Sequence, residues 1–302
     1  MSHGHPIGVI SRLSAPSLGA FRGRTAVKLG VTRKQLATLL AADAIERVLP
    51  DTYRMTATPR SGAQSLRAAL LWAGDSALAA GSSAGETYGL EGVRAAWPEI
   101  VVPRGMRLRS PDVVVHQSND RAPLMPRRHR DISVTGVEAT LVALAGVLDG
   151  EPFEIACEDA RRRRLTSVPS LRAYLDRFPG RPGAAPLRRL LDGLDPVHAA
   201  RSTLEVKTRR LLVVNGLTDF TREFPLVWNG RRYRFDFAFQ DRRTILETNG
   251  RRWHDDAVDY EHDNEKWSVP GRHGYRLVLA TWDKVEQHPT QLLAELATTL
   301  AA

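Results

Sequence analysis

Acidic residues in the last third of the chain have a spacing that could bind a metal ion. Asp236 lies in a run of alternating phenylalanines, and Glu247 lies in a second β-rich run after a polar turn. A period of two puts Phe235, Phe237 and Phe239 on one strand face and the aspartate on the other. The two runs predict a hairpin in which the two carboxylates lie side by side.

Carboxylates on adjacent strands are hard oxygen ligands of the kind that Mg²⁺ or Mn²⁺ prefers. We predict that Asp236 and Glu247 bind the ion together with the backbone carbonyl of Thr248. Asn249 shares a strand face with Glu247, and His254 follows on a short basic loop, close enough to transfer a proton. The alternative is that the two acids only form salt bridges with the arginines around them.

A helix is predicted upstream of these strands. Ser202 and Glu205 have the spacing of a capping box, with Ser202 as N-cap, and the helix is predicted to stop at Asn215-Gly216. In the simplest interpretation Glu205 only caps this helix.

An acid on a helix, an acid on a strand and a Glu-x-polar sequence on the next strand occur in this order in the PD-(D/E)xK nuclease superfamily. Residues 196–302 resemble its very-short-patch-repair endonuclease-like branch. The matching pieces are Ser202 with Glu205, Phe235–Phe237, Glu247–Gly250, Trp253–His254, the helix with Tyr260, Asp263 and Lys266, and the closing run Gly274–Trp282.

The resemblance implies a restriction-endonuclease-like α/β fold and metal-dependent hydrolysis of DNA. It also implies that Glu205 orients water or a second ion and that His254 acts as acid or base. Asn249 stands where the superfamily signature has lysine, and an amide cannot supply that cation. The branch that the chain resembles often uses a histidine instead, and His254 stands at the matching place.

Composition points to a cytoplasmic protein with no membrane partner. The 302 residues carry a formal charge of +9, and no apolar run approaches the ~20 residues that a membrane span needs. The N-terminus lacks the pattern of a signal peptide. Cys157 is the single cysteine, which excludes an internal disulfide. The positive charge suits a polyanionic partner such as DNA, although a GC-rich genome also favours arginine.

Residues 20–58 predict a winged helix-turn-helix. A short helix precedes a second helix over 32–42 with Thr32 as N-cap, and a small hairpin over 45–55 follows. In such a fold the start of the second helix enters the major groove, where Arg33, Lys34 and Gln35 would contact phosphates and base edges. A winged helix used for protein contacts or as a structural lid is the alternative.

Residues 59–195 resemble the region that follows the winged helix in AbiEi-type antitoxins of type IV toxin–antitoxin systems. The resemblance rests on helices predicted over 65–72, 137–144 and 153–160 and on short strands over 100–102 and 113–116. It implies a cognate toxin protein as a further partner.

We therefore expect an α/β multidomain protein with a winged helix-turn-helix over 20–58, an α/β middle domain over 59–195 and a restriction-endonuclease-like domain over 196–302. The expected activity is that of a metal-dependent DNA endonuclease in phage defence or DNA repair. The alternative is a non-catalytic DNA-binding regulator or antitoxin. Asn249 favours the regulator, and the joint presence of Glu205, Asp236, Glu247 and His254 favours the nuclease.

Overall fold

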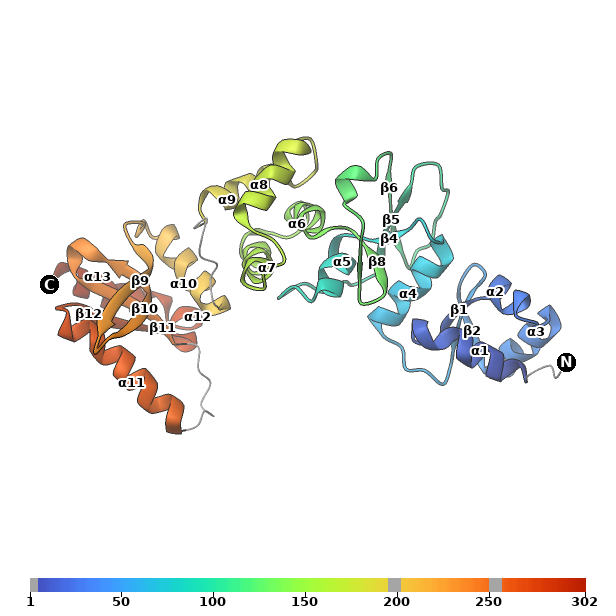
Figure 1. Cartoon of the computed structure of the whole chain (residues 1–302), viewed down its shortest axis with the longest axis horizontal. Helices are drawn as coiled ribbons and strands as arrows, with labels where there is room; N and C mark the ends of the chain where they lie inside the picture. Colours follow the sequence, from blue (N-terminus) through green and yellow to red (C-terminus); the bar gives the residue numbers. More distant parts are fainter. Residues whose placement is uncertain (1–4, 195–201, 250–256) are drawn as a thin grey trace. The chain divides into compact units, whose positions relative to one another are not determined.

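The computed structural model is an α/β protein with several helices and mixed sheets (Figure 1). It describes residues 5–194, 202–249 and 257–302, with the backbone alone for 257–263. Contacts divide the chain into two units. Unit 1 is the chain up to Leu148 with Ser170–Arg189, and unit 2 is Asp149–Pro169 with Leu190–Ala302.

The first part of unit 1 is a three-stranded antiparallel sheet, in the order β1-β3-β2, with three short helices. Ile10, Phe21 and Leu36 belong to its core. The elements are α1 (Pro6–Ser14), η1 (Ala15–Ser17), β1 (Ala20–Arg22), α2 (Gly23–Lys28), α3 (Arg33–Ala41), β2 (Ile45–Leu49) and β3 (Thr52–Met55).

A capping box starts α3. The Gln35 amide donates to Thr32 Oγ1 (3.1 Å), and the Thr32 amide donates to Gln35 Oε1 (2.8 Å). Thr32 is therefore confirmed as the N-cap. The predicted hairpin after this helix is confirmed as well, because β2 and β3 pair as antiparallel neighbours.

The second part of unit 1 is a five-stranded mixed sheet, in the order β6-β5-β4-β8-β7. The Tyr174 hydroxyl donates to the Pro123 carbonyl (2.6 Å) and so links α8 to η2. The elements are α4 (Gly62–Ala73), β4 (Leu78–Ala79), α5 (Gly81–Tyr88), β5 (Glu99–Pro103), β6 (Val114–Ser118), η2 (Ala122–Leu124), β7 (Arg127–His129), β8 (Ile132–Val134), α6 (Val137–Ala145) and most of both α8 (Val168–Arg177) and α9 (Ala184–Asp192).

Unit 2 is a four-stranded sheet, in the order β12-β11-β10-β9, with helices on both faces. β9, β10 and β11 are antiparallel neighbours, and β11 runs parallel to β12. The elements are α7 (Gly150–Arg162), α10 (Thr203–Val214), β9 (Thr221–Trp228), β10 (Arg231–Phe239), η3 (Gln240–Arg242), β11 (Thr244–Asn249), α11 (Ala257–Arg272), β12 (Arg276–Thr281), α12 (Trp282–Glu286) and α13 (Pro289–Ala301).

The hairpin predicted around Asp236 is confirmed, but the predicted alternation of its phenylalanines is wrong. Phe235 packs with Val269 of α11 on one face of the sheet. Phe237 and Phe239 pack with Leu204 of α10 on the opposite face. The period of two thus breaks at Asp236, because the tertiary structure provides an apolar layer on each side of β10.

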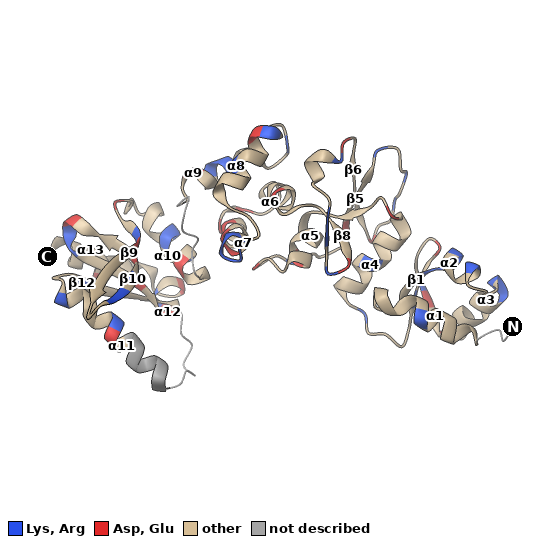
Figure 2. Ribbon diagram, in the orientation of Figure 1, with Lys and Arg blue, Asp and Glu red and all other residues tan. Residues whose placement is uncertain are grey.

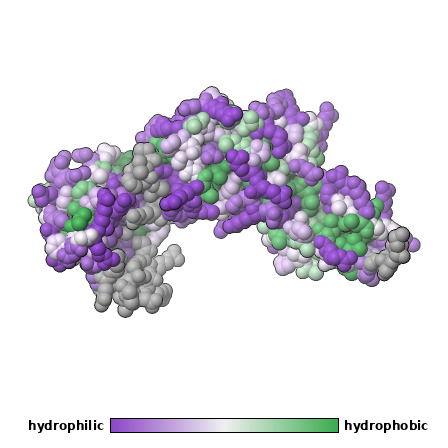
Figure 3. All heavy atoms as spheres, in the orientation of Figure 1, coloured by the Kyte–Doolittle hydropathy of each residue, from purple (hydrophilic) through white to green (hydrophobic). Residues whose placement is uncertain are grey.

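The surface is largely hydrophilic in the view of Figure 3, with an apolar patch on the N-terminal part of unit 1. Leu29, which is 55% exposed, is among the exposed apolar side chains of that part. In the described part of the chain, every helix is too short or too polar to cross a membrane.

Candidate metal centre

The central strand β10 places Asp236 between two glutamates. On β11, Glu247 follows Leu246, the partner of Phe237, and its carboxylate accepts from the Asp236 amide (3.1 Å). On β9, Glu223 lies between Arg222 and Phe224, the partners of Phe237 and Phe235. Residues opposite each other on neighbouring antiparallel strands have Cβ atoms about 5 Å apart. The sheet therefore brings three acidic residues from three strands to one place.

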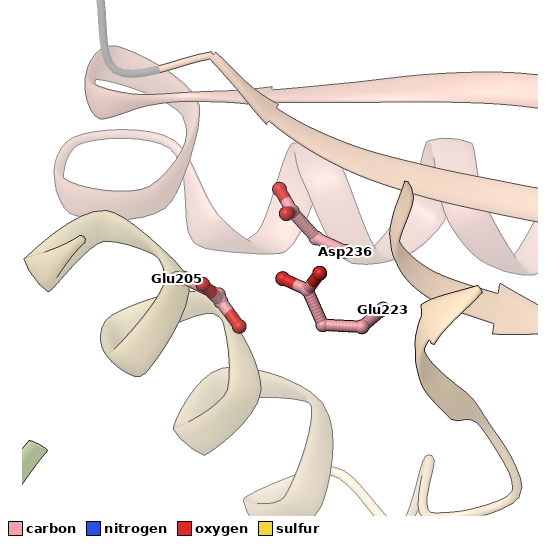
Figure 4. Close-up of side chains that lie close together, drawn as sticks. All are labelled: Glu205, Glu223 and Asp236. Atoms are coloured by element: carbon pink, nitrogen blue, oxygen red, sulfur yellow. The ribbon is translucent and has the colours of Figure 1, made fainter. Parts of the chain in front are cut away.

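Glu205 of α10 joins two of these acids. Glu205, Glu223 and Asp236 each offer a carboxylate oxygen, and these oxygens lie within 4.8 Å of one another. Figure 4 shows the three side chains pointing toward one another from the helix and the two strands. All three residues are buried, at 1%, 7% and 6% exposure respectively. We call these residues the carboxylate triad.

The start of α10 explains the position of Glu205. Ser202 is the N-cap, and its hydroxyl accepts a hydrogen bond from the Glu205 amide (3.2 Å), as predicted. The Glu205 carboxylate accepts from the Arg222 guanidinium at 2.9 Å. Glu205 thus does more than cap its helix, because its side chain is directed to β9 and the triad.

The triad concentrates negative charge away from water. Arg222 contacts Glu205, and Arg234 lies 3.6 Å from Glu223. Arg222 is shared with a further buried carboxylate, Glu158 of α7, at 4.0 Å. Buried like charges repel strongly in a low dielectric. A divalent cation among the three carboxylates would relieve that repulsion, and hard oxygen donors are its preferred ligands.

Glu247 lies beside Asp236 but has a different set of contacts. One of its carboxylate oxygens accepts from the Asp236 amide (3.1 Å), and the other pairs with Lys266 of α11. The Lys266 ammonium also lies 5.2 Å from the centre of the Phe235 ring. Burial, and then the negative charge of Asp236, raise the pKa of Glu247 to about 7, although Lys266 opposes the shift.

Thr248 acts on Asp236 through its donors. Its amide donates to Asp236 Oδ2 (2.8 Å), and its hydroxyl donates to the same oxygen. These bonds hold the aspartate in one orientation. The prediction for Thr248 concerned its carbonyl as a metal ligand, not these two donors. Asn249 is half-buried at the end of β11. His254, the predicted acid or base, lies outside the described residues.

The predicted DNA-contacting residues begin α3. Arg33 and Lys34 are exposed in its first turn, and Gln35 is half-buried in the capping box. Figure 2 shows basic residues on both α2 and α3. The side chains of Arg33 and Lys34 are therefore accessible. The side-chain oxygen of Gln35 already accepts a hydrogen bond from the Thr32 amide.

No family model matches the chain. It is similar to two uncharacterized proteins of Mycobacterium tuberculosis, MT2308 of strain CDC 1551 / Oshkosh and Rv2248 of strain ATCC 25618 / H37Rv. Each is 26% identical over 270 residues, which cover 88% of this chain and 96% of the relative. Among solved structures, the RV2827C protein from Mycobacterium tuberculosis matches with a TM-score of 0.43 and 19% identity, over 61% of this chain and 75% of that one. These names state no activity.

Glu223 is the member of the triad that the sequence analysis missed. The signal was present in Asn229-Gly230, which joins β9 to β10 with positive φ angles of 48° and 75°. Asn-Gly favours a two-residue hairpin, and such a turn fixes the register of the two strands. Counting back from this turn puts Glu223 between the partners of Phe235 and Phe237, the neighbours of Asp236.

Proposed function

We propose that the chain is a metal-dependent DNA endonuclease whose catalytic centre is the carboxylate triad with Glu247. The observation that carries the proposal is the convergence of three buried carboxylates from α10, β9 and β10. Their oxygen donors suit Mg²⁺ or Mn²⁺. The resemblance of residues 196–302 to very-short-patch-repair endonucleases, of the PD-(D/E)xK superfamily, supports the same activity.

Glu205, Glu223 and Asp236 would hold the ion. A bound divalent ion supplies positive charge beside the scissile phosphate and lowers the pKa of water. Thr248 keeps Asp236 in position through two hydrogen bonds to one oxygen. Lys266 brings a cation to Glu247, which the amide of Asn249 cannot do.

The N-terminal part of unit 1 supplies the proposed DNA contact. Three helices and the β2–β3 hairpin support the winged-helix interpretation, in which the start of α3 enters the major groove. The exposure of Arg33 and Lys34 supports contacts with phosphates. The formal charge of +9 adds a general attraction to DNA.

The test is cleavage of supercoiled plasmid in Mg²⁺ or Mn²⁺ by the wild-type protein and three variants. Asp236→Asn and Glu223→Gln keep the size of each side chain but remove a ligand charge. Each should lower the cleavage rate by at least about 100-fold, since losing a metal ligand costs several kcal/mol of transition-state stabilisation. Asp241→Asn, at an exposed position on η3, should cleave like the wild type.

The alternative is a non-catalytic DNA-binding regulator or antitoxin with a nuclease-like scaffold, which Asn249 favours. In that case the wild-type protein binds DNA but cleaves plasmid no faster than Asp236→Asn does. Isothermal titration with Mn²⁺ gives a second readout. The endonuclease proposal requires Mn²⁺ binding that both Asp236→Asn and Glu223→Gln weaken, and absence of binding to the wild type would contradict it.

A further inference from the structure

Unit 1 contains a cavity of about 900 Å³ beside the β2–β3 hairpin, α4 and the segment before β5. Such a volume suits a small-molecule ligand. Its wall has both apolar and polar surface and carries more positive than negative side chains. The arginines are Arg47, Arg54, Arg60, Arg67 and Arg130, and the acids are Glu46, Glu86 and Asp112.

Two of these arginines are already paired. Glu46 accepts from Arg54 at 2.8 Å and from Arg60 at 2.5 Å. Arg54 also donates to Gln64 (3.0 Å), which fixes its guanidinium inside the wall. Glu46 neutralises only one of these two charges, and the wall as a whole keeps an excess of two positive charges.

Arg67 adds a guanidinium to the same wall. One of its terminal nitrogens donates to the Arg130 carbonyl (3.3 Å), which holds the guanidinium between α4 and the β7–β8 turn. Its positive charge attracts anionic groups such as phosphates.

The start of α4 adds further donors to the wall. The cavity is lined by Ser61, Gly62 and Ala63, at the N-cap and the first turn of a 12-residue helix. Amides at such a position attract anions, because they lack partners within the helix and carry its positive dipole end. The helix and Arg67 together favour a phosphate.

Trp97 supplies an aromatic surface at the same cavity. It lines the wall and is 56% exposed. An exposed tryptophan beside arginines is the combination on which proteins stack nucleic-acid bases while they neutralise phosphates. A simple inorganic anion would need the basic groups only.

We propose that this cavity binds a nucleoside phosphate, with its phosphate at Arg67 and the start of α4 and its base on Trp97. A free nucleotide and the phosphorylated end of a DNA strand present the same groups. The site is separate from the carboxylate triad, which belongs to unit 2.

The test is isothermal titration of the full chain in EDTA with ATP, AMP, pyrophosphate and a short single-stranded oligonucleotide with and without a 5′-phosphate. Arg67→Ala should weaken binding about tenfold or more, as expected for the loss of a charged hydrogen bond. Trp97→Ala should weaken it by about five-fold to 100-fold through lost stacking. Arg107→Ala removes an exposed arginine of unit 1 outside the cavity and should change nothing.

Tight binding of ATP or AMP that both cavity variants weaken supports a free nucleotide as the ligand. Binding of only the 5′-phosphorylated oligonucleotide, with the same two losses, supports the end of a strand. Pyrophosphate that binds as tightly as ATP, equal binding by wild type and Trp97→Ala, or no binding of any probe overturns the proposal. Asp236→Asn should bind these probes normally, so a failed nuclease proposal leaves this one intact. Trp97 is exposed, so its variant should fold even if Arg67→Ala does not.

Discussion

At the scale of single residues, Asp236 and Glu223 mark the place where two neighbouring strands depart from regular alternation. Phe235 and Phe237 flank Asp236 but pack on opposite faces of the sheet. Glu223 has φ of 51°, in the left-handed region that costs a non-glycine residue about 1 kcal/mol or more. Glu223 and Asp236 both belong to the carboxylate triad. The irregular backbone therefore lies at the proposed catalytic centre.

A prediction at this scale concerns the pKa of His116, which lies on β6 in unit 1. Its Nε2 lies 2.7 Å from Glu99 Oε1, and the other oxygen of Glu99 accepts from the Ser82 amide (2.7 Å). The hydrogen bond to Glu99 raises the pKa of His116 above its usual 6.5, more than burial lowers it. The protonated histidine therefore stabilises the folded state.

The sign of the pH dependence follows from this shift. Because the folded pKa is raised, the stabilisation is fully present below pH 6.5 and is lost as the pH rises through the folded pKa. Wild-type protein should exceed His116→Gln in stability at about pH 6, and the difference should shrink toward pH 9. NMR titration of the ring protons measures the pKa, with Glu99→Gln as the control that should lower it. A pKa at or below 6.5 in the wild type would contradict the prediction.

At the scale of elements, α7 and α10 are joined by hydrogen bonds to a buried carboxylate. The Glu154 carboxylate of α7 accepts from Arg209 Nε and from Arg210 Nη1 of α10, both at 3.1 Å, and Glu154 is 1% exposed. Glu158 of the same helix lies near Arg222, which contacts the triad. The helix that holds Glu205 is thus oriented in part by a helix that precedes it in the chain by about forty residues.

Glu154→Ala tests this arrangement. It should lower the free energy of unfolding by about 1.5–3 kcal/mol, because it removes the charged hydrogen bonds that the partly buried Arg209 and Arg210 donate. Glu151→Ala on the same helix is the matched control. Its side chain is 34% exposed where it pairs with Lys207, and its loss should cost no more than about 1 kcal/mol. Chemical denaturation measures both, and equal losses would show that the buried pairs do not hold α7 and α10 together.

At the scale of the whole molecule, the charge of +9 predicts binding of DNA that depends strongly on salt. If α3 provides the contact, Arg33→Ala with Lys34→Ala should weaken binding. The slope of log K against log[salt] should also fall by about two, since each lost phosphate contact removes about 0.9 of slope.

Fluorescence anisotropy at several salt concentrations measures this slope. The control is the double variant Arg104→Ala with Arg107→Ala, which removes two exposed arginines of unit 1 outside α3. An unchanged slope in the α3 variant would place the DNA contact elsewhere on the chain.

The sequence by itself determined the local elements. Thr32 and Ser202 could be predicted as N-caps, because a cap depends on residues within three positions. The strands of Asp236 and Glu247 and their hairpin followed from β-rich runs around a polar turn, and this pairing placed the two acids side by side. These interactions join residues that are close to one another in the sequence, so local sequence patterns predict them.

Tertiary structure decided which of the acids converge. Glu205 meets Asp236 only because α10 packs on one face of the sheet, and Phe235 and Phe237 divide between two cores that exist only once helices cover both faces. Lys266 reaches Glu247 from α11, and α7 brings Glu158 to Arg222. The two-residue repeat of strands and the 3.6-residue repeat of helices do not predict these contacts. Burial and charge pairing between distant segments select the contacts after the elements have formed.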